Sequence, residues 1–197
     1  MDKQGLLDHL KKEGYSEEII TAFSQVKRED FLPEQYHRFA YEDAALPILY
    51  GKTISQPSTI AFMLELLEPV DGGKILEIGC GSGYVLSLLN CLCPSSEIYG
   101  TEIVKDLVKI SKKRLKKHKN VKIFYTPKKV GLIEKRPFDR ILVSASAHDI
   151  PYYLMEQLND GGVAVCPVRK SIIKFKRKNS KLETEEHFGF SFLPLIE

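Results

Sequence analysis

The amino-acid sequence predicts a doubly wound α/β fold, in which a mostly parallel seven-stranded sheet follows an N-terminal helical extension. Short apolar runs alternate with segments of helical periodicity along most of the chain, and a glycine-rich turn directly follows the first apolar run. The chain has 197 residues, of which 43% are hydrophobic and 28% charged, which is enough to bury one substantial core. We therefore expect a single domain over residues 1–197, with the extension over 1–58 and the α/β core over 59–197.

Two helices are expected in the N-terminal extension. Apolar residues recur at helical spacing over Leu6–Lys12 and Glu17–Val26, and Ser16 stands at the N-cap position of the second helix. No glycine-rich or proline-rich linker separates these helices from the rest of the chain. We therefore expect them to pack against the core.

Strands and helices alternate through the rest of the chain as far as residue 168, which is typical of a parallel sheet with helices on both faces. The expected helices are Thr59–Leu67, Tyr84–Cys91, Val104–Lys117 and Pro151–Leu158. The expected strands are Lys74–Ile78, Glu97–Glu102, Val121–Tyr125, Asp139–Ser144, Val163–Val168, Ser171–Lys176 and Phe188–Leu193. We expect the last two strands to form a hairpin at one edge, around the polar loop Arg177–Glu186.

Composition and charge exclude few partners but argue against export. The 29 basic and 26 acidic side chains leave a net charge of +3, which is too even to predict a nucleic-acid or membrane partner. No stretch of about 18 apolar residues could span a bilayer, and the first residues form no signal core, so we expect a cytoplasmic protein. The four cysteines lack the paired spacing of a zinc site, and we expect them to be reduced, with no metal bound.

The glycine-rich turn is the first sign of a ligand site. Gly79, Gly81 and Gly83 follow the strand Lys74–Ile78, at the sheet edge where open α/β folds bind ligands. The spacing is GxGxG rather than the GxGxxG of dinucleotide binders, and no P-loop lysine follows. The turn therefore favours a nucleoside ligand over a pyrophosphate.

Two acidic residues strengthen this interpretation. We expect Glu77 to end the first strand and to point toward the same crevice, and Glu102 ends the second strand, 19 positions after Gly83. A carboxylate at the end of the second strand can accept hydrogen bonds from both hydroxyls of a ribose. We therefore expect Glu102 to bind the ribose of the ligand.

Several segments together resemble one known family. Leu76–Tyr84 resembles the first motif of class I S-adenosylmethionine-dependent methyltransferases, in the form found in protein-L-isoaspartate (D-aspartate) O-methyltransferases. Gly51–Pro57 resembles that family's most diagnostic stretch, and the similarity extends from about Val26 to Leu195. The other similar segments are Arg28–Pro33, Ala40–Asp43, Pro137–Asp139, Ile150–Pro151, Gln157–Leu158, Gly161–Gly162, Cys166–Val168 and Phe192–Leu195.

The resemblance implies an activity, a cofactor and a substrate. The protein would transfer a methyl group from S-adenosyl-L-methionine to the α-carboxylate of L-isoaspartyl residues in damaged proteins and peptides, which is a repair function. The carboxylate is already ionised at neutral pH, so the protein needs to position the reactants rather than supply a general base. The resemblance also implies a monomer.

The same resemblance implies roles for individual residues. Ser55 would be the catalytic residue, because its hydroxyl would donate to the substrate carboxylate and aim one oxygen at the methyl group; otherwise it would suit the N-cap of the helix Thr59–Leu67. Thr53 and Ile54 would line the methionine end of the cofactor. The residues expected to bind the cofactor are Thr53, Ile54, Ser55, Ser58, Glu77, Gly79, Gly81, Ser82, Gly83, Glu102 and Ile103.

The sequence departs from the family pattern at four places. One is the region after Arg169, which is shorter than usual and lacks the glutamine-containing turn that relatives place over the cofactor. Thr126-Pro127-Lys128 stands where the family usually has Gly-Asp-Gly, whose aspartate binds the adenine amino group. Losing that bond would weaken cofactor binding about ten- to a hundred-fold. Ser58 stands where relatives often carry histidine or tyrosine, and Arg169 where they often have glycine; Arg169 suits either a carboxylate substrate or solvent.

Other functions stay open beside this one, the first being a class I methyltransferase with a different acceptor. The basic stretches Lys112–Lys119 and Lys174–Lys178 would suit a nucleic acid, but Ser144–Ala147 lacks the Asn/Asp-Pro-Pro-aromatic motif of amino-methylating enzymes. The changes at Thr126–Lys128 would suit a non-catalytic binding module with a methyltransferase-like fold. The glycine spacing argues against a nicotinamide-dependent dehydrogenase.

Overall fold

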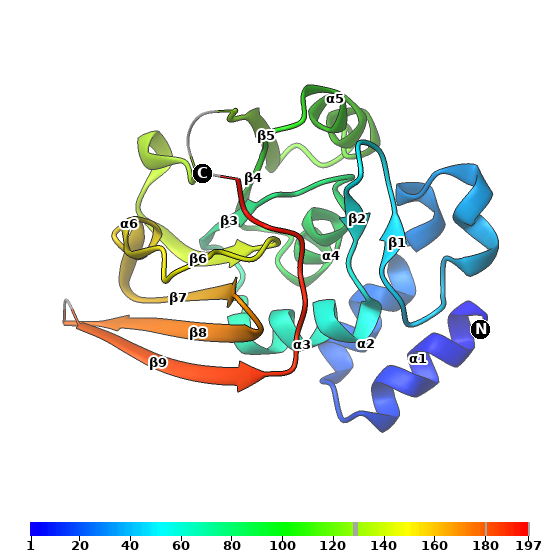
Figure 1. Cartoon of the computed structure of the whole chain (residues 1–197), viewed down its shortest axis with the longest axis horizontal. Helices are drawn as coiled ribbons and strands as arrows, with labels where there is room; N and C mark the ends of the chain where they lie inside the picture. The colour runs from blue at the N-terminus through cyan, green and yellow to red at the C-terminus, as the bar shows by residue number, and fades with distance from the viewer. Residues whose placement is uncertain (128–129, 180, 197) are drawn as a thin grey trace.

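The computed structural model describes residues 1–127, 130–179 and 181–196, and within them the chain builds a seven-stranded sheet flanked by helices (Figure 1). The strands lie in the order β5-β4-β3-β6-β7-β8-β9. Their bounds are β3 (Lys74–Ile78), β4 (Glu97–Glu102), β5 (Val121–Tyr125), β6 (Phe138–Val143), β7 (Leu158–Val168), β8 (Ser171–Lys178) and β9 (Lys181–Phe188). Strands β3 to β7 run parallel, and β8 and β9 are antiparallel to their neighbours. The predicted fold class is confirmed.

The helices and a small hairpin complete the described part of the chain. The α-helices are α1 (Lys3–Lys12), α2 (Glu17–Gln25), α3 (Pro57–Leu67), α4 (Tyr84–Leu92), α5 (Lys105–Arg114) and α6 (Tyr152–Met155). The 3-10 helices are η1 (Arg28–Phe31), η2 (Glu34–Phe39) and η3 (Ile133–Lys135), and the hairpin pairs β1 (Leu46–Pro47) with β2 (Thr53–Ile54). None of the helices in these described ranges is long and apolar enough to cross a membrane.

The order of the strands locates the ligand edge of the sheet. The chain moves outward from β3 through β4 to β5 and then returns to β6 on the other side of β3. This reversal leaves a crevice at the carboxyl end of β3, which is where open α/β sheets bind their ligands.

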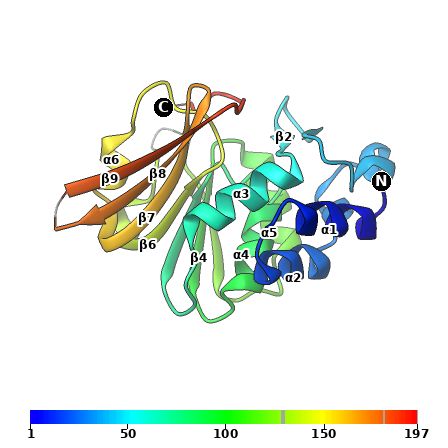
Figure 2. The same ribbon diagram turned by 90° about the horizontal axis from the view of Figure 1, so that it is seen from below.

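The period-two pattern of the strands explains why both faces of the sheet are covered. In β7, Val163 and Val165 belong to one buried cluster, whereas Ala164 and Cys166 belong to another on the opposite face. The first cluster packs under α3, α4 and α5, and the second packs under α6 (Figure 2). Strands with two buried faces read as continuous apolar runs, which is why these strands were predictable.

The N-terminal extension packs against the core, as expected. Leu6 and Leu10 of α1 are buried in the same cluster as the residues of α3 and α4. Helix α2 begins directly after Ser16, but the Ser16 hydroxyl does not cap it; the hydroxyl donates instead to Glu65 Oε2 on α3, at 3.1 Å. The division of the chain at residue 58, and a single domain over the whole chain, stay predictions.

The C-terminal part differs from the sequence prediction. The strand expected over Phe188–Leu193 is wrong, because β9 runs from Lys181 to Phe188 and pairs with β8 across the segment expected to be a polar loop. An edge strand exposed along most of its length needs no apolar alternation, so its charges resembled a loop. The helix expected over Pro151–Leu158 is also shorter, since β7 begins at Leu158.

Candidate functional site

A cavity of about 510 Å³ opens at the carboxyl edge of the central strands. Its floor comes from the ends of β3, β4 and β6, represented by Gly79, Glu102 and Ser144. One wall comes from the hairpin region between Ala45 and Thr59, and another from residues 189–196, all eight of which line the cavity. The crevice that the strand order predicts is therefore enclosed by two segments from distant parts of the chain.

The glycines of the turn adopt a backbone conformation that disfavours side chains. Gly79, Gly81 and Gly83 have φ values of +80°, +51° and +92°. Gly79 and Gly81 line the cavity, which leaves their backbone open to a ligand. Gly83 lies at the N-cap of α4 and does not line it; a Cβ atom there would approach Leu115 Cδ1 to 3.0 Å. Ser82 is buried and also lies outside the cavity lining.

Glu102 lines the cavity with a carboxylate that the backbone already holds. Its Oε2 accepts a hydrogen bond from Gly81 N at 2.8 Å, and its Oε1 accepts from Ile103 N at 2.8 Å and Val104 N at 2.9 Å. Three N–H groups occupy a carboxylate that offers about four acceptor positions. Glu102 therefore keeps acceptor capacity for a ribose hydroxyl, and the expected contact with both hydroxyls stays a prediction. Ile103 also lines the cavity.

Glu77 lies beneath the cavity and does not line it. It is buried, its Oε1 accepts a hydrogen bond from Ser144 Oγ at 2.8 Å, and its Oε2 has no partner among the described residues. Burial raises the pKa of Glu77 to about 8; the neighbouring Glu102 carboxylate adds to the rise, and the Ser144 hydrogen bond opposes it. Glu77 is therefore mostly protonated at neutral pH.

The hairpin region brings Ser55 to the cavity. Ser55 and Thr53 line it, whereas Ile54 between them is buried in the apolar core, as alternation along an extended chain requires. Helix α3 begins at Pro57 with Gln56 in the N-cap position, so Ser55 is not the cap of this helix. Ser58 does not line the cavity, and its backbone N–H donates to Asp43 Oδ1 at 2.8 Å.

Residues 189–196, which we call the C-terminal strap, cross the carboxyl edge of the sheet after β9 (Figure 1). At one end, the N–H groups of Gly189 and Phe190 both donate to Lys170 O. Further along, the backbone N–H of Ser146 donates to Leu193 O, and the backbone carbonyl of Ser146 accepts from Leu195 N, both at 2.8 Å. The Phe190 ring stacks on Phe62 of α3 at 5.3 Å. The strap is therefore attached at separate points and closes one side of the cavity.

Besides Ser58, two other departures from the family pattern lie in the described part of the chain. Thr126 lines the cavity beyond the end of β5, and Lys128 lies outside the described residues. Arg169 does not line the cavity; its Nη2 donates to Asp149 Oδ1 at 2.8 Å on an exposed surface. Arg169 is thus already paired, which favours the solvent-exposed alternative over a substrate contact.

Sequence reasoning assigned no role to several residues that line the cavity. Lys52, Gln56 and Ser144 line it, as does the whole strap. Lys52 and Glu102 are the charged side chains among the described lining residues. A signal existed for Gln56, which lies inside the motif that contains Ser55, but its side-chain orientation depends on residues distant in sequence.

A positive-φ glycine turn, a carboxylate at the end of the neighbouring strand and a cavity joining them define a nucleoside-binding protein of the doubly wound α/β class. The family model described as Protein-L-isoaspartate(D-aspartate) O-methyltransferase matches residues 1–197. The chain belongs to this family.

Individual relatives agree with this assignment. The Protein-L-isoaspartate O-methyltransferase of Methanothrix thermoacetophila is 39% identical over 201 residues, which cover 100% of this chain and 95% of the relative. A solved protein-L-isoaspartate O-methyltransferase superposes with a TM-score of 0.90 at 27% identity, covering 100% of this chain and 66% of the other. A putative protein-L-isoaspartate O-methyltransferase from Plasmodium falciparum, solved with S-adenosyl-L-homocysteine, superposes with a TM-score of 0.87 at 26% identity, covering 100% and 99% of the two chains.

Proposed function

We propose that the protein methylates the α-carboxylate of L-isoaspartyl residues in damaged proteins and peptides, with S-adenosyl-L-methionine as the methyl donor. The single observation that carries the proposal is that Ser55, the Gly79–Gly81 turn and Glu102 line one cavity, although they come from different parts of the chain. The match of the whole chain to the family supports the same activity.

The residues of the cavity fit the cofactor. Glu102 retains about one acceptor position for a ribose hydroxyl, and the turn offers bare backbone at Gly79 and Gly81. The volume of about 510 Å³ is in the range typical of small-ligand sites. Among the predicted cofactor contacts, this geometry supports Thr53, Ser55, Gly79, Gly81, Glu102 and Ile103. It gives less support to Ile54, Ser58, Glu77, Ser82 and Gly83, which do not line the cavity.

The chemistry requires positioning more than proton transfer. When bound, S-adenosyl-L-methionine supplies a methyl group activated on a sulfonium, and the ionised substrate carboxylate needs no base. The Ser55 hydroxyl would donate to one carboxylate oxygen and leave the other free to attack. The C-terminal strap would exclude water from the same space. Alignment of this kind contributes several kcal/mol to lowering a barrier, about 7 or more in ideal cases.

Two lysines of the basic run on β8 already lie close to glutamates. In the basic run of β8, Lys174 Nζ forms an ion pair with Glu68, and Lys178 Nζ lies 3.8 Å from Glu183 Oε1. Paired lysines offer less attraction to phosphates than free ones. The run therefore adds little support to the nucleic-acid alternative.

We also propose that the protein is monomeric and that it is located in the cytoplasm. Its four cysteines are free thiols, and Cys80, Cys93 and Cys166 are buried, which suits a reducing compartment. Light scattering on the purified protein tests the monomer, and fractionation of the native cells tests the compartment.

Transfer of radiolabelled methyl groups from S-adenosyl-L-methionine tests the function. The acceptors are a short isoaspartyl peptide and the matching aspartyl peptide. Selective labelling of the isoaspartyl peptide is expected, as a base-labile methyl ester. If neither peptide is labelled, calorimetry with S-adenosyl-L-homocysteine separates the alternatives: binding would indicate another acceptor, and no binding a non-catalytic module.

A further inference from the structure

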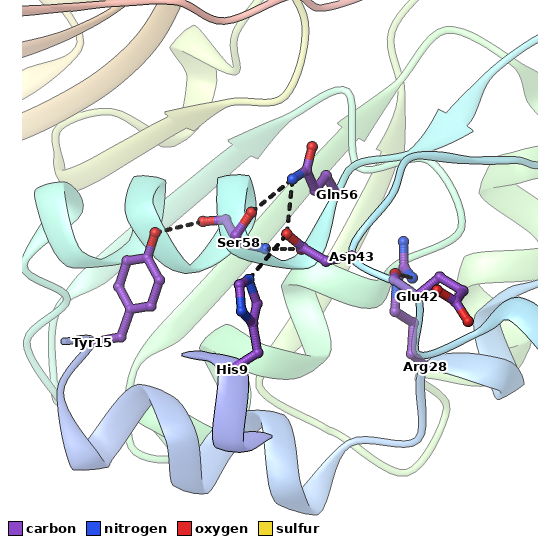
Figure 3. Close-up of polar contacts among 7 residues, drawn as sticks. All are labelled: His9, Tyr15, Arg28, Glu42, Asp43, Gln56 and Ser58. Atoms are coloured by element: carbon purple, nitrogen blue, oxygen red, sulfur yellow. Dashed lines mark hydrogen bonds and ion pairs between the residues drawn. The ribbon is translucent and has the colours of Figure 1, made fainter. Parts of the chain in front are cut away.

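The side-chain amide of Gln56 is held in one orientation beside the cavity. Its Nε2 donates to Asp43 Oδ2 at 2.9 Å and to Ser58 Oγ at 2.9 Å (Figure 3). These two bonds use both N–H groups of the amide. Gln56 lines the cavity, immediately after Ser55.

Asp43 sets this orientation because it can only accept hydrogen bonds. Burial favours the neutral acid, but hydrogen bonds from the Ser58 N–H, the Gln56 amide and the Ser58 hydroxyl hold the pKa of Asp43 below its usual value. Its carboxylate also lies 3.4 Å from His9 Nε2 of α1. A reversed Gln56 amide would put the carbonyl oxygen against this carboxylate, acceptor against acceptor.

The fixed amide presents its carbonyl oxygen, Oε1, away from Asp43 and Ser58 (Figure 3). No donor within the described ranges is assigned to Oε1, and it is not enclosed as a buried, unpaired atom. Ser55 and Gln56 both line the cavity, so two consecutive residues of its wall carry a hydroxyl group, which can donate, and an amide carbonyl oxygen, which can accept.

This donor and acceptor match the two polar groups that an isoaspartyl residue carries on one carbon. Its backbone N–H and its α-carboxylate are both bonded to Cα, whereas the side-chain carboxylate of a normal aspartyl residue is one methylene further from Cα. Resting on the proposed function, we propose that Gln56 Oε1 accepts a hydrogen bond from the backbone N–H of the isoaspartyl residue, and that Asp43 is the residue that positions this amide.

The contact would contribute to substrate specificity. A site that binds the carboxylate alone would accept any carboxylate that reached Ser55. A second contact at a set separation favours the acceptor whose N–H and carboxylate share one carbon, because a misplaced N–H leaves Gln56 unpaired.

The test removes each partner of the proposed bond in turn. The enzyme variant is Gln56→Met, which keeps the length of the side chain without the amide, and Gln25→Met at an exposed position on α2 is the matched control. The altered acceptor is the same peptide with oxygen in place of the α-nitrogen of the isoaspartyl residue, so that the carboxylate stays and the N–H is lost. Methyl transfer gives kcat/KM for each pair, and calorimetry gives the Kd for S-adenosyl-L-homocysteine.

We expect wild type and Gln25→Met to lose about ten-fold in kcat/KM on the altered acceptor. Gln56→Met should lose about ten-fold on the isoaspartyl peptide, should treat the two acceptors alike, and should keep the wild-type Kd. Unchanged discrimination by Gln56→Met would overturn the inference. So would a Kd that weakens as much as kcat/KM falls, because Oε1 would then face the amino group of the cofactor. No labelling of the isoaspartyl peptide by wild type would overturn the proposed function itself.

Asp43→Asn provides a second readout that a merely structural role would not produce. The asparagine can still accept from Ser58 N, but its Nδ2 would favour a reversed Gln56 amide, with N–H groups toward the cavity. Asp43→Asn should therefore abolish or reverse the discrimination between the two acceptors. Adding Gln56→Met to it should cause no further loss. Additive losses in the double variant would contradict the positioning role of Asp43.

Discussion

The guanidinium of Arg28 donates a hydrogen bond to the backbone carbonyl of Ser55, with Nη2 and O separated by 3.0 Å. Arg28 is fully buried, and it also donates to the carbonyl oxygens of Ala40, Glu42 and Ala44. One side chain therefore joins the loop that follows η2 to the residue proposed to orient the substrate. Burial lowers the pKa of Arg28 to about 10, so it stays a cation at neutral pH.

Arg28→Lys should lower both stability and methyl transfer. A lysine has a single nitrogen in place of the planar fork and cannot reach four carbonyl groups, so at least one buried hydrogen bond to a charged group is lost. We expect the free energy of unfolding to fall by about 2–3 kcal/mol in urea titrations. Arg38→Lys, on the more exposed η2, is the control. Equal stability of the two variants would contradict the proposed role of the Arg28 hydrogen bonds.

Ser55→Ala should reduce methyl transfer far more than cofactor binding. The change removes the proposed donor to the substrate carboxylate, while Gly79, Gly81 and Glu102 keep their places. We expect kcat/KM for the isoaspartyl peptide to fall about ten-fold or more, with the Kd for S-adenosyl-L-homocysteine nearly constant. If kcat/KM and the affinity for S-adenosyl-L-homocysteine fell by the same factor, Ser55 would not be the donor to the substrate carboxylate.

Glu102→Gln should weaken cofactor binding. A glutamine keeps one oxygen acceptor, but its amide nitrogen would face an N–H group that now bonds to the carboxylate, either Gly81 N on one side or Ile103 N and Val104 N on the other. The turn would shift, and the ribose would lose a charged acceptor. We expect the Kd for S-adenosyl-L-homocysteine to rise about ten-fold or more, measured by calorimetry. Glu134→Gln is a control outside the cavity lining, and an unchanged Kd for Glu102→Gln would refute the ribose contact.

Glu77→Gln should change how stability depends on pH. The folded pKa of Glu77, about 8, lies above the ordinary value of 4.5, so between these pH values the folded protein holds a proton that the unfolded chain releases. Binding of this proton stabilises the folded state. The contribution to the unfolding free energy is fully present below about pH 4.5 and is lost as the pH rises through 8. Relative to Glu77→Gln, wild type should lose up to about 1.4 kcal/mol of unfolding free energy per pH unit in this window. Urea titrations at several pH values measure the difference, and parallel pH profiles would show that Glu77 does not titrate in this way.

The core strands were predictable because their burial on both faces leaves a clear apolar pattern, and the glycine turn marks the end of β3. The meeting of Gly79, Gly81 and Glu102 at one cavity also follows from strand order alone. The edge strand β9 was not predictable in this way, because its position is determined by pairing with β8 and not by its own apolar residues.

The remaining parts of the site depend on contacts between distant residues. The direction of the Gln56 amide depends on Asp43, and the Ser55 backbone depends on Arg28, but neither pairing produces a periodic pattern in the sequence. The strap closes the cavity through Lys170 and Ser146, which precede it by about twenty to fifty residues. The functional roles of the predicted site residues stay predictions until the variants above are measured.

The charges of β9 have a further consequence for a protein proposed to handle damaged chains. Ageing proteins expose strands that can add to an open sheet edge and begin aggregation. Here β9 is the last strand of the sheet, and its exposed residues include Glu183, Glu185 and Glu186. A strand from a damaged substrate that tried to extend this sheet would have to pair its backbone alongside a row of carboxylates. At this edge of the sheet, the carboxylates therefore disfavour the addition of a strand from a damaged chain.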